Sequence, residues 1–266
     1  MENNINAPET RSHAAEDAAG QSDSLVIIPM YNEKENARAI IEAVLSLRTP
    51  MDVLVIDDNS PDGTAGIVKE LMQEHPGRVH IIERAGKLGL GTAYIAGFKW
   101  ALERKHYKYI TEMDADFSHN PADLERLRAA CEEGADVAIG SRYVSGVNVV
   151  NWPMGRVLMS YFASKYVRAV TGLPIHDTTA GFVCYKRRVL ATIDLDDIKF
   201  KGYAFQIEMK LTAHKHGFKV VEVPIIFVNR VLGESKMNSS IFGEAMIGVV
   251  KLKLRSLRKN YGAPVE

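Results

Sequence analysis

The chain has 266 residues, of which 46% are hydrophobic and 25% charged, and this is enough for one sizeable α/β domain. Its 33 basic and 33 acidic residues cancel, so we expect no nucleic acid as a partner. Two cysteines, Cys131 and Cys184, suit neither a metal-ligand spacing nor a disulfide framework. Because no apolar run approaches the roughly 18 residues of a spanning helix and no signal core opens the chain, we expect a cytoplasmic protein.

The first half of the chain alternates short apolar runs with helical patterns. It follows a small, polar, Ala-rich stretch at 1–22, which we expect to be a disordered tail before a domain at 23–239. The alternation predicts βαβ units and a mostly parallel, Rossmann-like α/β sheet with helices on both faces. The expected elements are strands at 24–28, 51–56, 79–82, 107–113 and 137–139, and helices at 33–48, 62–75, 91–104 and from Pro121 onward.

The second half of the chain is less regular. Its last helix, expected at about 240–259, has an apolar beginning and a basic end, so 240–266 is set apart as a basic helix and tail. The other expected elements are helices at 153–170 and 203–217 and strands at 182–185 and 219–223.

Polar residues follow three of the expected strands. They lie at 29–33, 57–58 and 114–116. In open α/β sheets, ligands bind beyond the carboxyl ends of the strands. The coincidence therefore predicts a binding site at this edge of the sheet.

Asp114 and Asp116 directly follow the strand expected at 107–113. Two carboxylates this close can share one divalent cation with diphosphate oxygens, and Mg²⁺ or Mn²⁺ suits such hard oxygen ligands. An isolated Asp-x-Asp is more often a solvated acidic turn. The strand in front of this pair and the other polar strand ends favour a metal site.

Two further stretches have both a functional and a structural interpretation. In 55–64, a carboxylate at the strand tip can accept hydrogen bonds from a base or ribose, whereas Ser60 or Asp62 can simply cap the next helix. The glycine-rich stretch 86–91 does not match the dinucleotide-binding pattern. A flexible loop that caps a helix is its better interpretation, with Lys87 placed to approach a phosphate.

Eight motifs follow one another along the sequence, at 29–33, 55–64, 87–94, 113–116, 140–143, 177–182, 202–208 and 230–236. Taken in this order, they resemble the inverting family 2 glycosyltransferases, and the full set resembles the dolichol-phosphate (polyprenol-phosphate) mannose synthases in their soluble catalytic form. The resemblance extends over about 24–255 and implies a GT-A type nucleotide-sugar-binding fold.

The resemblance also implies a role for each matching residue. Asp116 and Arg142 would be catalytic, and Asp114 and Asp116 would hold a Mg²⁺ or Mn²⁺ ion. Ser118 stands where some relatives carry a glutamine that contacts the metal. The implied donor-binding residues are Pro29, Tyr31, Glu33, Ile56 and Asp58 for the guanosine, Asp114, Ala115 and Asp116 for the diphosphate, and Arg142, Arg230 and Lys236 for phosphates of donor or acceptor.

The implied reaction is an inverting, in-line transfer of mannose from GDP-mannose to a dolichyl or polyprenyl phosphate. The second pKa of a phosphate monoester is about 6, so the nucleophile is already ionised and needs no strong general base. His176 and Asp177 are then better interpreted as a turn with a satisfied histidine than as an acid–base pair. A related transferase with another donor, such as UDP-glucose, and a non-catalytic nucleotide-binding module are the alternatives. The oligomeric state stays open.

An acceptor embedded in a membrane implies that the protein contacts the membrane surface. The segment 241–259 combines an apolar first half with five cations, and we expect it to lie at the interface as a peripheral anchor. The alternative is a final helix that packs on the domain with a solvated basic end. The helix expected at 153–170, which follows Trp152, is a second candidate for the membrane contact.

Overall fold

The computed structural model describes residues 22–202, 204–229 and 240–264, without the side chains of 240–245. Residues 1–21 of the expected tail lie outside the described residues. The motif at 230–236, which holds Arg230 and Lys236, also lies outside the described residues.

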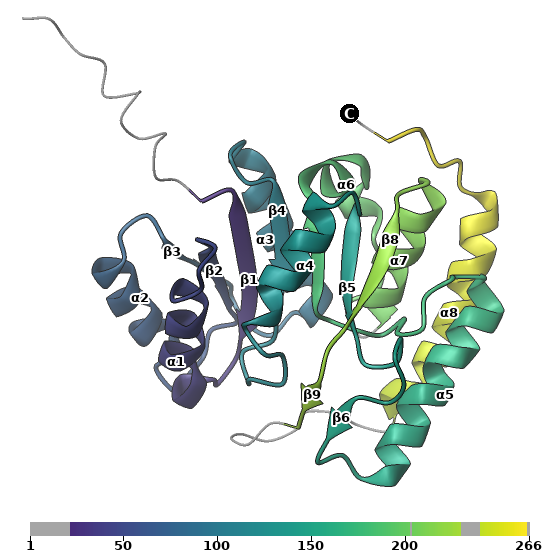
Figure 1. Cartoon of the computed structure of the whole chain (residues 1–266), viewed down its shortest axis with the longest axis horizontal. Helices are drawn as coiled ribbons and strands as arrows, with labels where there is room; N and C mark the ends of the chain where they lie inside the picture. Colours follow the sequence, from purple (N-terminus) through teal and green to yellow (C-terminus); the bar gives the residue numbers. More distant parts are fainter. Residues whose placement is uncertain (1–21, 203, 230–239, 265–266) are drawn as a thin grey trace, which may run out of the picture.

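The middle layer of the described structure is a seven-stranded sheet, built from β1 (Ser24–Met30), β2 (Asp52–Asp57), β3 (Val79–Glu83), β4 (Tyr109–Glu112), β5 (Val137–Ser141), β7 (Val183–Lys186) and β8 (Val220–Pro224). The strand order is β3-β2-β1-β4-β7-β5-β8 (Figure 1). β7 is antiparallel to β4 and β5, and the other neighbouring pairs are parallel. The prediction of a mostly parallel α/β sheet is confirmed.

Helices cover both faces of this sheet. One core cluster joins it to α1 (Lys34–Leu45), α2 (Thr64–Glu74) and α4 (Asp123–Glu132), and the other joins it to α3 (Leu90–Glu103), α6 (Arg187–Thr192) and α7 (Ala204–Lys215). In β1, Val26 and Ile28 belong to the first cluster, whereas Leu25 and Ile27 belong to the second. Burial of each such side chain stabilises the fold by about 1.5–3 kcal/mol. The uninterrupted apolar run of β1 follows from this, because a central strand is buried on both faces.

Two long helices, α5 (Met154–Thr171) and α8 (Ser240–Arg258), lie side by side at one end of the molecule (Figure 1). The Tyr166 hydroxyl of α5 donates to the Met246 carbonyl of α8 at 3.1 Å, and Val249 and Leu252 of α8 are buried in the same core cluster as Val167 of α5. The described part of the C-terminal segment is thus packed against the domain. No helix among the described residues is long and apolar enough to cross a membrane.

Several features differ from the sequence-based expectation. A separate pair of two-residue parallel strands, β6 (Val149–Val150) and β9 (Phe227–Val228), and the short helix α6 were not expected. Elements this short are below the length at which hydrophobic periodicity can be recognised. β1 also continues through Pro29 to Met30, because a missing N–H at the strand tip removes a single ladder bond.

Candidate functional site

A cleft of about 750 Å³ opens beyond the carboxyl ends of β1, β2, β4 and β5. It joins the polar strand ends that the sequence predicted to lie together. Ile56 is an exception, since its side chain is fully buried in the core cluster shared with α3 and does not line the cleft. The expected residues that do line it are Pro29, Tyr31, Glu33, Asp58, Asp114, Ala115, Asp116 and Arg142.

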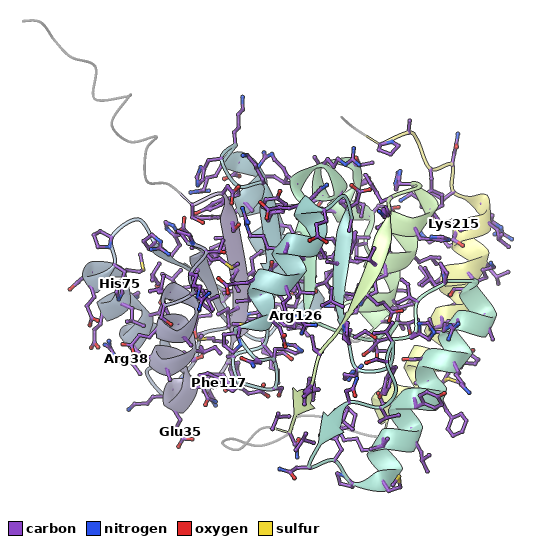
Figure 2. All side chains as sticks on the ribbon, viewed as in Figure 1. Glu35, Arg38, His75, Phe117, Arg126 and Lys215 are labelled. Atoms are coloured by element: carbon purple, nitrogen blue, oxygen red, sulfur yellow. The ribbon has the colours of Figure 1, made fainter. Side chains whose placement is uncertain are left out.

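The turn after β4 presents two carboxylates to the cleft. Asp116 is only 8% exposed, and its Oδ1 accepts hydrogen bonds from the backbone N–H of Ser118 at 3.0 Å and from the Ser118 hydroxyl at 2.5 Å. The intervening Phe117 is partly exposed (Figure 2) and has a φ of +57°, a left-handed conformation that costs an ordinary residue about 1–2 kcal/mol. Strain of this kind is concentrated at functional sites, where it fixes a side chain in place.

His119, which the sequence analysis did not identify, contacts the backbone of the same turn. Its Nδ1 accepts the backbone N–H of Asp114 at 3.2 Å, and its ring stacks on Phe182 with the ring centres 4.7 Å apart. Burial lowers the pKa of His119 to about 4, so the ring is neutral at physiological pH and can accept this hydrogen bond.

The two carboxylates at this turn fit a divalent cation whose other ligands come from a bound phosphate and water. Among the described residues, no third His, Cys, Asp or Glu joins Asp114 and Asp116 to complete a protein-only metal site. Two carboxylates that leave the other positions to phosphate and water are the usual protein contribution to a Mg²⁺ site. The Ser118 hydroxyl donates to Asp116, so Ser118 orients a carboxylate in this structure.

The polar residues after β2 crosslink neighbouring loops. Asp57 accepts two hydrogen bonds from Ser60, and Asp62 accepts from the backbone N–H groups of both Lys34 and Thr64. Ser60 and Asp62 therefore have a structural role, but not as the helix cap that the sequence suggested, because α2 begins after Gly63 without a side-chain capping hydrogen bond. Asp58 reaches the cleft itself, where both of its carboxylate oxygens accept from Arg84.

The glycine-rich stretch forms the loop before α3, as expected. Gly89 has a φ of +105°, and a Cβ on Gly91 would stand 2.7 Å from the Phe205 ring and 2.9 Å from the Phe200 carbonyl oxygen. These glycines thus allow close packing. Lys87 lines the cleft, with its ammonium 5.3 Å from the centre of the Tyr31 ring.

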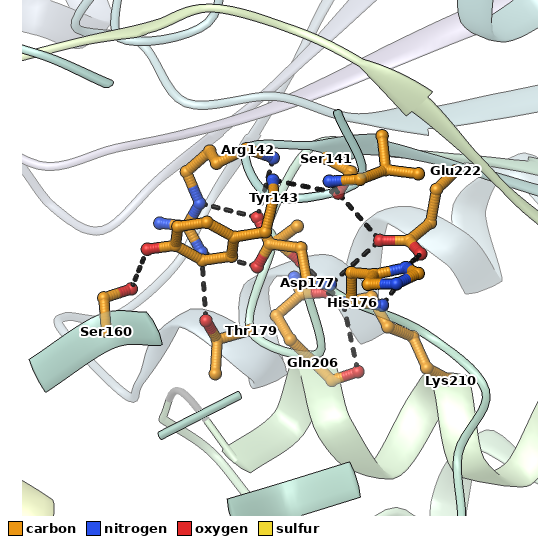
Figure 3. A network of polar contacts seen from close by, with 12 residues as sticks. Ser141, Arg142, Tyr143, Ser160, His176, Asp177, Thr179, Gln206, Lys210 and Glu222 are labelled. Atoms are coloured by element: carbon orange, nitrogen blue, oxygen red, sulfur yellow. Dashed lines mark hydrogen bonds and ion pairs between the residues drawn. The ribbon is translucent and has the colours of Figure 1, made fainter. Parts of the chain in front are cut away.

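Arg142 enters the cleft from the end of β5 and is held by a buried carboxylate (Figure 3). Its Nε and Nη2 donate to the two oxygens of Asp177 at 2.7 and 2.6 Å, and Nη2 also donates to the Thr179 hydroxyl at 3.0 Å. Burial alone would raise the pKa of the Asp177 carboxyl, but the Arg142 guanidinium lowers it below its ordinary value. Arg142 is therefore presented to the cleft in one orientation.

His176 and Asp177 do not face each other as an acid–base pair. His176 Nδ1 lies 2.8 Å from Glu222 Oε2, and the backbone N–H groups of both residues donate to the same Glu222 carboxylate (Figure 3). The interpretation as a turn with a satisfied histidine agrees with these contacts.

A second arginine, Arg156 on α5, also lines the cleft and was missed in the sequence. The Arg156 guanidinium lies 4.0 Å from the Trp152 ring centre, and the Arg142 guanidinium lies 5.6 Å from the same ring. Arg156 Nη1 also donates to the Asn229 side chain at 2.9 Å. A tryptophan just before a helix and an arginine in its first turn are the sequence signal that could have identified this pair.

Behind the cleft, a buried polar cluster supports the loop that carries Thr179 and Ala180. Gln206 of α7 donates to Glu112 at 2.5 Å, and the Lys210 ammonium donates to the Ala180 carbonyl at 2.6 Å. Burial raises the pKa of Glu112 and lowers that of Lys210. Gln206 and Ala180 line the cleft, so this cluster fixes part of its wall.

A family model described as glycosyl transferase family 2 matches residues 25–194, more than half of the chain. The chain belongs to this family. A polyprenol monophosphomannose synthase from Mycolicibacterium smegmatis is 50% identical over 232 residues, which cover 87% of each chain. An undecaprenyl-phosphate mannosyltransferase from Micrococcus luteus is 47% identical over 227 residues, covering 85% of this chain and 92% of that one. The resemblance seen in the motifs is confirmed.

Solved structures of GT-A glycosyltransferases share the fold. Glucosyl-3-phosphoglycerate synthase from Mycobacterium tuberculosis, in complex with Mn²⁺, UDP and glucosyl-3-phosphoglycerate, superposes with a TM-score of 0.63 at 16% identity, covering 98% of this chain and 88% of that one. A mannosyltransferase from Pyrobaculum calidifontis in complex with GDP-Man and Mn²⁺ gives a TM-score of 0.54 at 16% identity, covering 92% and 67%. The GT-A type fold is therefore confirmed for this family 2 member.

Proposed function

We propose that this family 2 member transfers mannose from GDP-mannose to a polyprenyl or dolichyl phosphate, with inversion at the anomeric carbon. The observation that carries the proposal is that one cleft contains both the carboxylate turn of Asp114 and Asp116 and the arginine pair Arg142 and Arg156. A cleft that only bound a nucleotide would need no second cationic site. The printed names of the two relatives support a mannosyl group and a polyprenyl phosphate as the reacting partners.

The chemistry is one in-line displacement. An acceptor phosphate oxygen forms a bond to the anomeric carbon as the bond from that carbon to the donor diphosphate breaks, and GDP leaves. The phosphate is already an anion near pH 7, since its second pKa is about 6, so no side chain has to remove a proton. Attack opposite the leaving group converts an α-linked donor into a β-mannosyl phosphate.

The residues of the cleft would divide two tasks. Arg142 and Arg156 would orient the acceptor phosphate, because planar guanidinium groups match phosphate oxygens. Asp114 and Asp116 would hold a Mg²⁺ or Mn²⁺ ion, which when bound neutralises the negative charge growing on the leaving diphosphate. Tyr31, Glu33, Asp58 and the backbone around Pro29 and Ala115 would bind the rest of the donor, while the contributions of Ile56, Arg230 and Lys236 stay predictions from the family resemblance.

A nucleotide-release assay tests the proposal. The purified protein is mixed with GDP-mannose or UDP-glucose, with or without polyprenyl phosphate in detergent, and in Mn²⁺ or EDTA. We expect GDP release that requires both the lipid phosphate and the metal, with a β-linked product by NMR. Release of UDP from UDP-glucose, without release of GDP from GDP-mannose, would identify UDP-glucose as the donor. Nucleotide binding without release of either diphosphate would favour the non-catalytic module.

We also propose that the protein works as a peripheral protein at a membrane surface. Apolar side chains at helical spacing are exposed on α5 and α8, among them Phe162 at 59% and Leu257 at 64%. Cations flank them on both helices. Exposed apolar area beside cations is the combination that binds anionic headgroups. The exposed apolar residues are Met154, Leu158, Met159 and Phe162 on α5, and Ile247, Val250, Leu254 and Leu257 on α8.

A further inference from the structure

Arg84 directly follows β3 and forms a two-bond ion pair with Asp58 at the tip of β2. Its Nε donates to Oδ1 at 2.6 Å and its Nη2 to Oδ2 at 2.8 Å. Its Nη1 donates to the Thr92 hydroxyl at 2.7 Å, which in turn donates to the Gly89 carbonyl at 2.7 Å. The Arg84 and Asp58 side chains are 9% and 10% exposed. Burial and three directed hydrogen bonds leave the guanidinium one orientation.

This arginine stands behind the cleft. Asp58 and Gly89 line the cleft and Arg84 does not. One guanidinium therefore fixes two parts of the wall, the carboxylate at the tip of β2 and the loop before α3. The same loop carries Lys87, whose ammonium lies 5.3 Å from the centre of the Tyr31 ring.

The charge of Arg84 matters as well as its geometry. Glu33, Asp114 and Asp116 line the same cleft as Asp58, so a nucleoside diphosphate enters a site rich in carboxylates. Without its ion pair, Asp58 would add an uncompensated negative charge and would be largely buried without a partner, which is strongly unfavourable. Paired with Arg84, each Asp58 oxygen keeps a lone pair that can accept a hydrogen bond from a base or ribose.

We propose that Arg84 is a positioning residue for the nucleoside diphosphate of the donor. It holds Asp58 and the glycine-rich loop in the geometry that binds the donor, without touching the donor itself. This inference rests on the proposed function, in which Asp58 contacts the guanosine. Loss of Arg84 weakens donor binding and leaves the use of the acceptor unchanged.

A matched ion pair at the other end of the same two strands provides the control. Arg78 precedes β3, and its Nε donates to Asp52 at the start of β2 at 2.7 Å, while its Nη2 donates to the Met51 carbonyl at 2.8 Å. The Asp52 side chain is 2% exposed, and neither residue lines the cleft. Arg78→Gln thus removes an arginine that is more exposed, at 34% against 9% for Arg84, but pairs the same two strands away from the cleft.

The test compares Arg84→Gln, Arg84→Lys and Arg78→Gln with the wild type. Calorimetry gives the Kd for GDP and UDP, and steady-state kinetics give KM and kcat with GDP-mannose and polyprenyl phosphate. Arg84→Gln should raise the GDP Kd and the donor KM about tenfold or more, because a misplaced Asp58 would lose its charged hydrogen bond to the donor, and one such bond has an effect of this size. The acceptor KM should stay within about twofold of the wild-type value. Arg84→Lys should give a GDP Kd between those of the wild type and Arg84→Gln, because lysine keeps the positive charge and loses the planar guanidinium. Arg78→Gln should lower the melting temperature without changing the GDP Kd.

A double-variant cycle tests whether Arg84 acts through Asp58. In an Asp58→Asn background, Arg84→Gln should change the GDP Kd by less than about twofold, because coupled residues are not additive. The double variant removes both charges of the buried pair, so it can still be measured if Arg84→Gln alone does not fold. A full additional effect in that background, or an unchanged GDP Kd in folded Arg84→Gln, would overturn the inference. A wild type that binds UDP and not GDP would contradict the proposed donor, and the Arg84 comparison would then be made with UDP.

Discussion

Asp114 and Asp116 differ in how firmly the protein holds them. The Asp114 side chain is 40% exposed, whereas Asp116 is buried and accepts two hydrogen bonds from Ser118. Asp116 is therefore the better pre-organised of the two carboxylates. Removal of its whole side chain would leave the Ser118 donors without an acceptor, at a cost of about 1–3 kcal/mol in stability.

Asp116→Asn separates the charge of this residue from its hydrogen bonds. The amide oxygen can still accept from Ser118, so the melting temperature should stay close to that of the wild type. Transfer should fall by about two orders of magnitude or more, because a charge-stabilising ligand is lost. The matched control is Asp123→Asn, which removes a carboxylate that pairs with Arg126 on α4, outside the cleft. Near-normal turnover of Asp116→Asn at saturating Mn²⁺ would remove Asp116 from the proposed metal site.

Arg156 offers a cleaner test of the acceptor site than Arg142. Replacing Arg142 would strand the fully buried Asp177, and breaking such a pair costs about 3–5 kcal/mol in stability. The described contacts of Arg156 to the Asn229 side chain and the Trp152 ring are to uncharged groups, so losing them should cost the fold less. We expect Arg156→Gln to raise the KM for polyprenyl phosphate about tenfold, the effect of one charged hydrogen bond, with no change in the KM for GDP-mannose.

Kinetics with both substrates, measured beside the α5 control Arg168→Gln, check this expectation. A raised KM for GDP-mannose with an unchanged KM for the lipid phosphate would instead assign Arg156 to the donor diphosphate.

The sequence predicted those cleft residues that lie just after a strand of the mostly parallel sheet. Asp58 follows the end of β2, and Asp114 and Asp116 lie in the turn after β4. Arg84 could not be predicted, because its partner Asp58 lies 26 residues away and only the pairing of β2 with β3 brings them together. The same reason hid His119 and Lys210, whose importance comes from buried contacts and not from a motif.

At the scale of single elements, replacing a glycine by alanine should have opposite effects on stability in α3 and in α2. A Cβ on Gly97 of α3 would stand 2.8 Å from the Ile27 side chain of β1, whereas a Cβ on Gly66 of α2 would meet nothing within 4 Å. Gly97→Ala should destabilise the fold by about 1–3 kcal/mol through overpacking. Gly66→Ala should stabilise it by about 0.5–1 kcal/mol through helix propensity. Urea denaturation of both variants decides the matter, and equal effects would contradict the close approach of α3 to the sheet.

The elements that could be predicted are those whose pattern reflects burial. The inner residues of β1 and β2 are apolar because helices cover both faces of these strands, and the long amphipathic helices show one buried stripe. The reversed direction of β7 could not be predicted, since a strand buried on both faces has the same composition in either direction. The packing of α8 was also left open, because an apolar stripe with a basic end suits a membrane surface and a protein surface equally well.

At the scale of the whole molecule, α8 is attached to the domain by its basic end. Arg255 pairs with Glu208 at 3.0 Å, Lys259 pairs with Asp197 at 2.6 Å, and the Lys253 ammonium donates to the Thr171 carbonyl at 3.0 Å. These three cations are engaged by the domain, and the interfacial anchor expected at 241–259 stays a prediction. The exposed apolar side chains of α8 and of its neighbour α5 are the better candidates for the membrane contact. They lie at the end of the molecule opposite α2 (Figure 1).

Replacing exposed apolar side chains on this surface by glutamate tests the membrane contact without truncating a helix that completes the core. Leu254→Glu/Leu257→Glu removes two exposed leucines from α8, and Leu158→Glu/Phe162→Glu does the same on α5. Burial of one such side chain in a membrane interface is worth about 1.5–3 kcal/mol, so each double variant should sediment with anionic liposomes at least about tenfold less well than the wild type.

Gln73→Glu on the distant helix α2 is the control for added negative charge and should bind as the wild type does. Because the substituted side chains are exposed, the melting temperatures should not change, and transfer to a detergent-solubilised acceptor should be retained. Loss of binding in the α8 variant alone would restrict the contact to that helix, whereas full binding by both variants would exclude this surface as the anchor.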